Sequence, residues 1–92
     1  MRLRVAADGA VTLEEPDDFT RFAVLATPGA TLAGVARREG NHAWVPPAAL
    51  RRLAPHAGAP DWEQGFGRML AYAGSKGWVD AEGAVRAHVE AI

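Results

Sequence analysis

The residues best suited to acid–base or metal chemistry in this chain are three histidines, His42, His56 and His88. They lie on three separate segments, and their spacing gives no reason to expect that they meet. His88 and Glu90 are two positions apart, so on a helix they would point away from each other. A metal site usually needs three or four ligands, and no His-Glu-x-x-His motif is present. We therefore expect no metal site and interpret His88 as a boundary histidine, with a general base at a pocket rim as the alternative.

The sequence contains no familiar motif for catalysis by serine, cysteine or paired carboxylates. Ser75 is the sole serine, and it lacks the Gly-x-Ser-x-Gly context of an activated nucleophile. The chain has no cysteine, which excludes thiol chemistry and disulfides. The acidic run at 14–18 lacks the spacing of a calcium loop, so we interpret it as a solvent-exposed turn. These observations predict no catalytic residue and no cofactor, and they favour a protein that is not an enzyme.

Two glycines, Gly65 and Gly67, stand inside a segment that otherwise predicts a helix. Each glycine in a helix interior costs about 1 kcal/mol relative to alanine, so two glycines within one turn need an explanation. They do not form a phosphate-binding fingerprint, which would open the helix instead of interrupting it. Gly65 falls at the edge of the apolar stripe, near Tyr72. Close approach of another part of the chain, of a partner chain or of a small ligand would explain Gly65, and we favour the first.

Two pairs of arginines, Arg37-Arg38 and Arg51-Arg52, flank a corner around Trp44. On a common face they would suit an acidic partner or an anionic ligand, because the arginine fork matches carboxylate and phosphate groups. The alternative is that each pair belongs to a solvated helix face. Tryptophan and arginine are both enriched at the hot spots of protein interfaces, which makes Trp44 and Arg51 binding candidates.

A helix that carries several of these residues is predicted over residues 61–75. Its large apolar side chains recur at helical spacing and are Trp62, Phe66, Met69 and Leu70. Asp61 and Gln64 fit a capping box at the start of this helix, in which each side chain bonds an amide that the helix leaves free. The stripe gives the helix one face to bury.

A second helix is predicted over residues 81–92. Gly77 can take the left-handed conformation that ends the first helix, and Trp78 then folds back over its last turn. Asp80 would cap the second helix, whose apolar stripe consists of Val85, Val89 and Ile92. The two helices would form a C-terminal helical hairpin that needs the N-terminal part of the chain to bury its apolar face.

The N-terminal part of the chain predicts a small sheet. Asp8-Gly9 between alternating apolar residues is the strongest short signal of a β-hairpin, with strands at about 2–6 and 11–14. Residues 19–27 fit either a helix or a strand. Their short length and the flanking proline and glycine favour a strand.

Shorter elements are expected between this sheet and the C-terminal helices. Residues 31–38 predict a short helix, and residues 42–45 predict a fourth strand or extended segment. Pro47 suits the first position of a helix over 47–54, because proline lacks the amide that this position leaves free.

Composition indicates a small globular protein of 92 residues, of which 49% are hydrophobic and 23% are charged, with a net charge of −1. The predicted fold is a single α+β domain over residues 1–92. It has three or four antiparallel or mixed strands that helices cover on one face. No apolar run approaches a membrane span and the first residues do not resemble a signal peptide, so we expect a cytoplasmic protein without membrane contact. Abundant alanine and arginine suggest a bacterial source.

The leading functional hypothesis is a small accessory domain that binds a protein partner or a second copy of itself. It would use apolar surface on the helical layer with arginines at the rim. The predicted binding residues are Trp44, Arg51, Trp62, Gly65, Tyr72, Trp78 and His88.

Two other classes of function remain open. A small-molecule binder or small isomerase-like enzyme would hold its ligand between sheet and helices, in a pocket lined by Trp62, Tyr72, Trp78 and His88. A DNA-binding helix-turn-helix is disfavoured because the helices at 47–54 and 61–75 are too far apart in sequence. The acidic start of the second of these helices would also repel phosphate, so no nucleic acid is expected.

Overall fold

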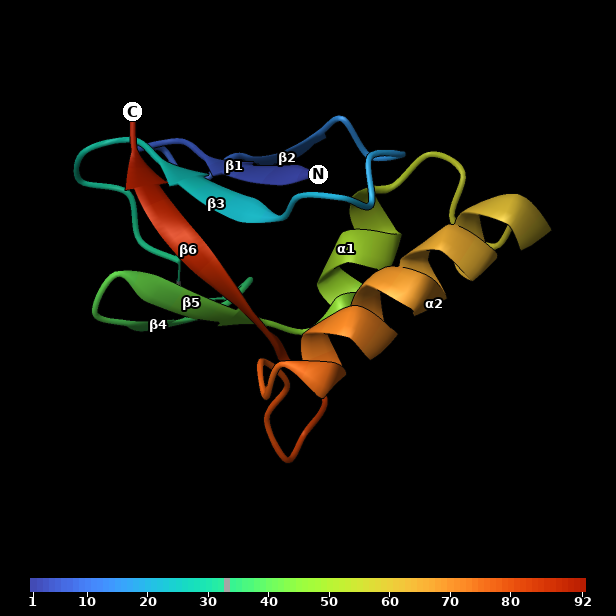
Figure 1. Cartoon of the computed structure of the whole chain (residues 1–92). Helices are drawn as coiled ribbons and strands as arrows, with labels where there is room; N and C mark the ends of the chain where they lie inside the picture. The colour runs from blue at the N-terminus through green and yellow to red at the C-terminus, as the bar shows by residue number, and fades with distance from the viewer. Residues whose placement is uncertain (33) are drawn as a thin grey trace.

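A strongly curved sheet organises the chain in the computed structural model, which describes residues 1–32 and 34–92 (Figure 1). The described strands are β1 (Arg2–Val5), β2 (Val11–Glu14), β3 (Ala23–Ala26), β4 (Arg37–Glu39), β5 (His42–Val45) and β6 (Val85–Ala91). The described helices are α1 (Pro47–Leu53) and α2 (Pro60–Ser75). The order in the sheet is β2-β1-β3-β6-β5-β4, with β3 parallel to both β1 and β6 and the other pairs antiparallel.

This six-stranded mixed sheet, counted over the described residues, shows that the predicted fold class is wrong. A sheet of three or four strands with a C-terminal helical hairpin was expected, but residues 85–91 form β6 at the centre of the sheet. Val85, Ala87 and Val89 are buried and alternate with exposed side chains. A valine spacing of four fits both a helix and a strand, and β-branched valine packs well on a pleated surface.

The segment before β6 is a turn and not the predicted helix start. Asp80 does accept backbone hydrogen bonds, as a cap would, but from Glu82 N and Ala84 N, each at 2.9 Å from its Oδ1. Gly83 adopts a left-handed φ of 86° inside this turn. The prediction that Asp80 caps a helix is therefore wrong, because these hydrogen bonds close a turn that leads into a strand.

The predicted N-terminal hairpin and third strand are confirmed. Ala6 N donates to Ala10 O at 2.9 Å, and Asp8 Oδ1 accepts from Ala10 N at 2.9 Å. Gly9 has a φ of 89°, which explains why glycine follows Asp8 in this turn. The strand expected within 19–27 is β3, which is shorter than the predicted segment.

The helix predicted over residues 31–38 is wrong for the part of it that the structure describes; its residue 33 lies outside the described residues. Arg37 and Arg38 belong to β4, which forms a hairpin with β5 through a turn at Gly40. The predicted strand at 42–45 is confirmed as β5. Cross-strand pairing of Arg37 with Trp44 stabilises an extended conformation that the short segment could not specify alone.

The two helices begin and end largely as predicted. Pro47 occupies the first turn of α1. The predicted capping box of α2 is wrong, because Ala59 is the N-cap and no side chain bonds it. At the other end Trp78 N donates to Ala73 O at 2.9 Å and Gly77 has a φ of 77°, which confirms the left-handed stop.

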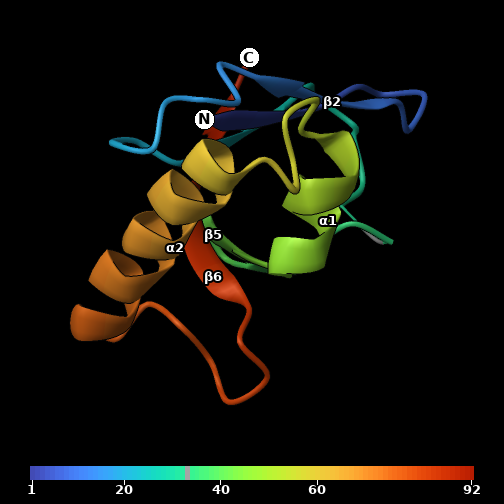
Figure 2. The same ribbon diagram turned by 90° about the vertical axis from the view of Figure 1, so that its right-hand side faces the viewer.

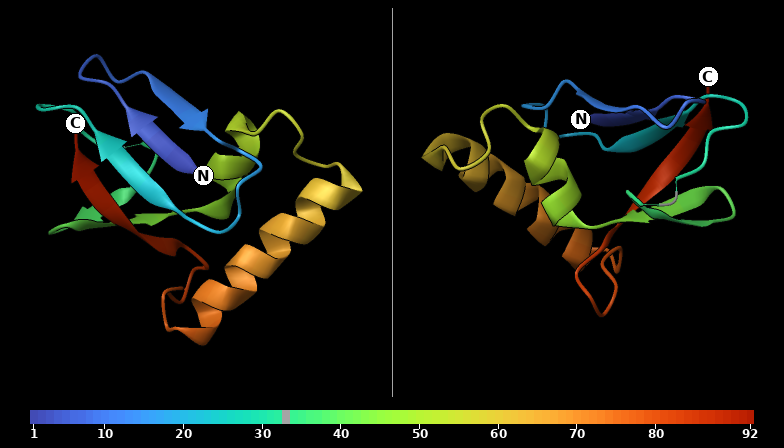
Figure 3. Two further views of the ribbon diagram at one scale, coloured as in Figure 1. Left: turned by 45° about the horizontal axis from the view of Figure 1, so that its top comes forward. Right: turned by 180° about the vertical axis from the view of Figure 1, so that it is seen from behind.

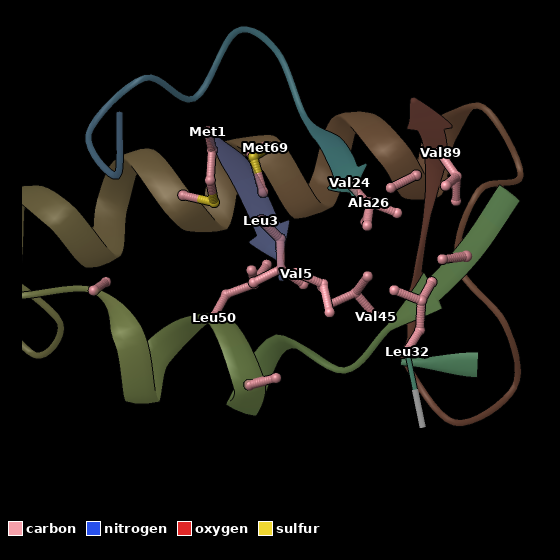
Figure 4. Close-up of a cluster of buried hydrophobic side chains, with 14 of the residues drawn as sticks. Met1, Leu3, Val5, Val24, Ala26, Leu32, Val45, Leu50, Met69 and Val89 are labelled. Carbon is pink, nitrogen blue, oxygen red and sulfur yellow. The ribbon is translucent and has the colours of Figure 1, made fainter. Parts of the chain in front are cut away.

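Both helices lie on the same side of the sheet, as Figure 2 shows, and one core joins them to it. The buried stripe of α2 includes Trp62, Phe66 and Met69, as predicted. Figure 4 shows side chains of four strands and both helices converging in this core. In the part of the chain that is described, no helix has the length and apolarity needed to cross a membrane.

Candidate functional site

An exposed aromatic pair stands where α2 ends. Tyr72 has 59% of its surface exposed and Trp78 has 38%. Their ring centroids are 6.1 Å apart at an interplanar angle of 74°, an edge-to-face arrangement, and Lys76 Nζ lies 5.5 Å from the Tyr72 ring centroid. The backbone stop of α2 turns Trp78 toward β6, where Arg86 N donates to Trp78 O at 2.8 Å. Both views in Figure 3 show this end of α2 beside the start of β6.

Three adjoining cavities surround this pair, and we call them together the aromatic groove. The first, about 410 Å³, is lined by Phe19, Thr20, Gly65, Arg68, Met69 and Tyr72. The second, about 120 Å³, is lined by Phe19, Thr20, Arg21, Phe22, Met69, Tyr72, Ala73, Trp78, Val85 and Arg86. The third, about 260 Å³, is lined by Phe22, His42, Trp78, Arg86 and His88. The first and second cavities share four lining residues and the second and third share three, so they follow one another from the side of α2 to the sheet.

Gly65 is explained by the ring that forms the wall of the first cavity. A Cβ atom added at Gly65 would lie 2.4 Å from Phe19 Cε2 and 2.5 Å from Phe19 Cδ2. The Phe19 ring therefore rests directly against the backbone of α2, and it also contacts Trp62 edge-on at 5.8 Å. Close approach of another part of the chain, the favoured explanation of this glycine, is what the structure contains.

Two of the three histidines meet at the other end of the groove. His42 and His88 are direct neighbours across β5 and β6, with ring centroids 5.9 Å apart. Val89 N donates to Asn41 O at 2.8 Å, so the histidines form the pair between hydrogen bonds, where side chains come closest. Arg86 Nη2 lies 3.0 Å from His42 Nε2 and 3.4 Å from His42 Nδ1, so the guanidinium lies against the imidazole ring.

The charged side chains that line the groove are all positive. Arg21, Arg68 and Arg86 line its cavities, and among the described residues no aspartate or glutamate lines any of the three. Asp18 precedes this wall, and hydrogen bonds from the Thr20 hydroxyl and amide lower the pKa of its carboxyl, with smaller contributions from the charges of the N-terminus and Arg21. None of the three arginines forms an ion pair among the described residues.

Trp62, in contrast, is a core residue. Only 4% of its surface is exposed, its ring stacks on Phe66 at 4.7 Å, and its Nε1 donates to Pro16 O at 3.0 Å. It lines a different cavity, of about 330 Å³, together with Asp17 and His56. Of the four residues predicted to line one pocket between sheet and helices, Trp62 is therefore separated from the other three, because it is one of the core side chains that fill that space.

Trp44 and Arg51 do not line the groove, although Trp44 is the cross-strand neighbour of Arg86. Trp44 is half-buried with the Arg37 guanidinium 5.6 Å from its ring centroid, and it lines a cavity that also contains Asp80. Arg37 forms an ion pair with Asp80, with 3.5 Å between Nη2 and Oδ2. Arg51 Nη2 lies 3.2 Å from Glu63 Oε1. The two predicted basic pairs thus each have an arginine whose charge a carboxylate of the same chain offsets.

The structure brings together four of the seven predicted binding residues, Gly65, Tyr72, Trp78 and His88. Sequence reasoning missed the other main walls of the groove, Phe19, Phe22, His42 and Arg86. The alternation of polar and apolar residues in β6, recognised as a strand, would have placed Arg86 on the same sheet face as His88. No comparable signal predicts Phe19 beside Gly65, because that contact joins distant segments.

His56 does not join the other histidines. Its Nδ1 lies 3.4 Å from Asp17, on the far side of Phe19 from the groove. Within residues 1–32 and 34–92, no three side chains of histidine, aspartate or glutamate are grouped so that they could hold a metal ion. Searches for this chain among protein families, curated proteins and solved structures gave no match.

Proposed function

We propose that this chain is a non-catalytic interaction domain whose aromatic groove holds a segment of a partner protein. The single observation that carries the proposal is the exposed pair of Tyr72 and Trp78 beside three adjoining cavities. Large aromatic side chains supply most of the binding energy at protein interfaces, and exposed ones on a domain this small call for a reason.

The shape of the groove favours an extended segment over a compact small ligand. Its three cavities follow one another from Gly65 on α2, past Trp78, to His88 on β6. Successive side chains of one segment would occupy these three cavities in turn. A rigid wall supports this binding mode, because Phe19 and Met69 under the groove are also part of the core or packed against it.

The test is selection from a library of random peptides displayed on phage, using the full chain as bait. Peptides that bind through the groove should lose at least about tenfold in affinity on Trp78→Ala and on Tyr72→Ala. Ile92→Ala is the matched control, because Ile92 is exposed and lies outside the three cavities. Failure to enrich any peptide that depends on Trp78 would overturn the proposal for a partner protein.

Self-association is the other form of the interaction hypothesis, and size-exclusion mass at micromolar concentration tests it. If the wild type is a dimer that Trp78→Ala dissociates, a second copy occupies the groove and no separate partner is needed for binding. If the wild type is a monomer and displayed peptides depend on Trp78, the partner is a different chain.

A further inference from the structure

We infer that the segment held by the aromatic groove is acidic, and that Arg86 is the residue that anchors its carboxylate. The inference rests on the proposed function and adds the chemistry of the partner. An apolar or aromatic side chain of the segment would contact Tyr72 and Trp78, while a neighbouring aspartate or glutamate side chain reaches Arg86. The carboxylates of the segment would supply the negative charge that the walls of the groove lack.

The first support is the way cations are distributed over the described residues. Four arginines form ion pairs with carboxylates of the same chain, and these are Arg2, Arg4, Arg37 and Arg51. In contrast, Arg68 and Arg86 line the groove and Lys76 lies over Tyr72, and none of the three forms an ion pair within the described part of the chain. Away from the groove, Arg38 and Arg52 also form no ion pair among the described residues. The groove differs in that several such cations gather there and no described carboxylate lines its cavities.

The second support is the position and orientation of Arg86 itself. It lines both the second and the third cavity, and its side chain is exposed on β6. Contact of its Nη2 with the His42 ring, 3.0 Å from Nε2 and 3.4 Å from Nδ1, positions the guanidinium beside the groove. A guanidinium has five N–H donors in one plane, so most remain for a carboxylate, which two parallel hydrogen bonds can hold.

A short acidic segment fits these charges better than a nucleic acid does. The whole chain carries a net charge of −1, with 11 acidic side chains against 10 basic ones. A nucleic acid brings a phosphate at every nucleotide, and its phosphates beyond the groove would meet a chain whose overall charge is slightly negative. A peptide places its charges only where the arginines are.

The experiment compares the peptides selected on the wild-type chain with their amide counterparts, in which Gln and Asn replace Glu and Asp. Binding is measured by fluorescence anisotropy at low and at physiological salt. Selected peptides should be enriched in acidic residues next to an aromatic or aliphatic residue. Replacement by amides, and Arg86→Gln or Arg86→Glu in the protein, should each weaken binding at least about tenfold, and salt should reduce the difference. Arg52→Gln is the control, because Arg52 is an exposed arginine that lines another cavity.

The possible results separate failure of this inference from failure of the proposed function. Trp78-dependent peptides without acidic residues, or ones insensitive to both Arg86 variants, would overturn this inference and leave the interaction domain intact. Absence of Trp78-dependent peptides would overturn both. A single-stranded oligonucleotide that binds with dependence on Trp78 and Arg86 more tightly than any selected peptide would also overturn the acidic peptide as the partner.

Discussion

At the scale of single residues, the two glycines of α2 show how one residue type can serve opposite purposes. Gly65 gives the Phe19 ring room to lie against the helix backbone, and Gly67 has nothing within 4 Å of the Cβ position. Neither glycine has a left-handed φ, so both positions accept a side chain as far as the backbone is concerned. The Phe19 ring that packs on Gly65 forms a wall of the groove, whereas Gly67 only weakens the helix.

This contrast makes a matched prediction for the free energy of unfolding, measured by urea denaturation. Gly67→Ala should raise it by about 0.5–1 kcal/mol, because alanine restricts the unfolded chain and favours the helix. Gly65→Ala should lower it by about 1–3 kcal/mol, because the new methyl group must displace the Phe19 ring. Equal effects of the two substitutions would show that Phe19 does not rest on Gly65 in solution.

At the scale of elements, β6 shows why pattern alone misassigned the end of the chain. Its seven residues contain valines four apart, which match a helix, and an alternation of apolar and polar side chains, which matches a strand. What decides between them is pairing with β3 and β5, two strands from distant parts of the sequence. The predicted stop of α2 depended only on local residues, and it is confirmed.

The strand and helix assignments of β6 can be separated by two alanines. A helix with its stripe on Val85, Val89 and Ile92 would expose both Ala87 and Ala91, whereas in β6 Ala87 is buried and Ala91 is exposed. Ala87→Glu should therefore cost about 3–5 kcal/mol or prevent folding, because it buries an unpaired charge. Ala91→Glu should change stability by less than about 0.5 kcal/mol. Circular dichroism and urea denaturation measure both, and tolerance of Ala87→Glu would contradict the strand.

At the scale of the whole molecule, the positively charged side chains fall into two groups: some form ion pairs within the chain, and others lie beside exposed aromatic rings. Ion pairs tie the outer strands together, as where Arg4 donates to Glu14 across β1 and β2. Elsewhere cations remain free beside exposed aromatic rings. A net charge of −1 does not reveal this division, since it depends on which side chains the fold brings together.

The carboxylate of Glu14, which forms ion pairs with arginines, predicts how the free energy of unfolding depends on pH. The hydrogen bond from Arg4, together with the charges of Arg4 and Arg2, lowers the pKa of Glu14 below its ordinary value. A carboxyl with a lowered folded-state pKa stabilises the fold above its unfolded pKa, and this stabilisation is lost as pH falls through the folded-state value. The free energy of unfolding should therefore decrease below about pH 4.5. Glu14→Gln should flatten that decrease in urea denaturation, and parallel curves for the two proteins would contradict the assignment.

By itself the sequence determined the features that depend on neighbouring residues. These are the hairpin at Asp8-Gly9, the start of α1 at Pro47, the apolar stripe of α2 and its end at Gly77. Only the tertiary structure decided that the last segment is a strand and that Phe19 lies on Gly65. It also brought His42, His88 and Arg86 together beside Trp78. The physical reason is that backbone pairing in a sheet and contacts between side chains join residues far apart in the chain, and no local pattern encodes which of them will meet.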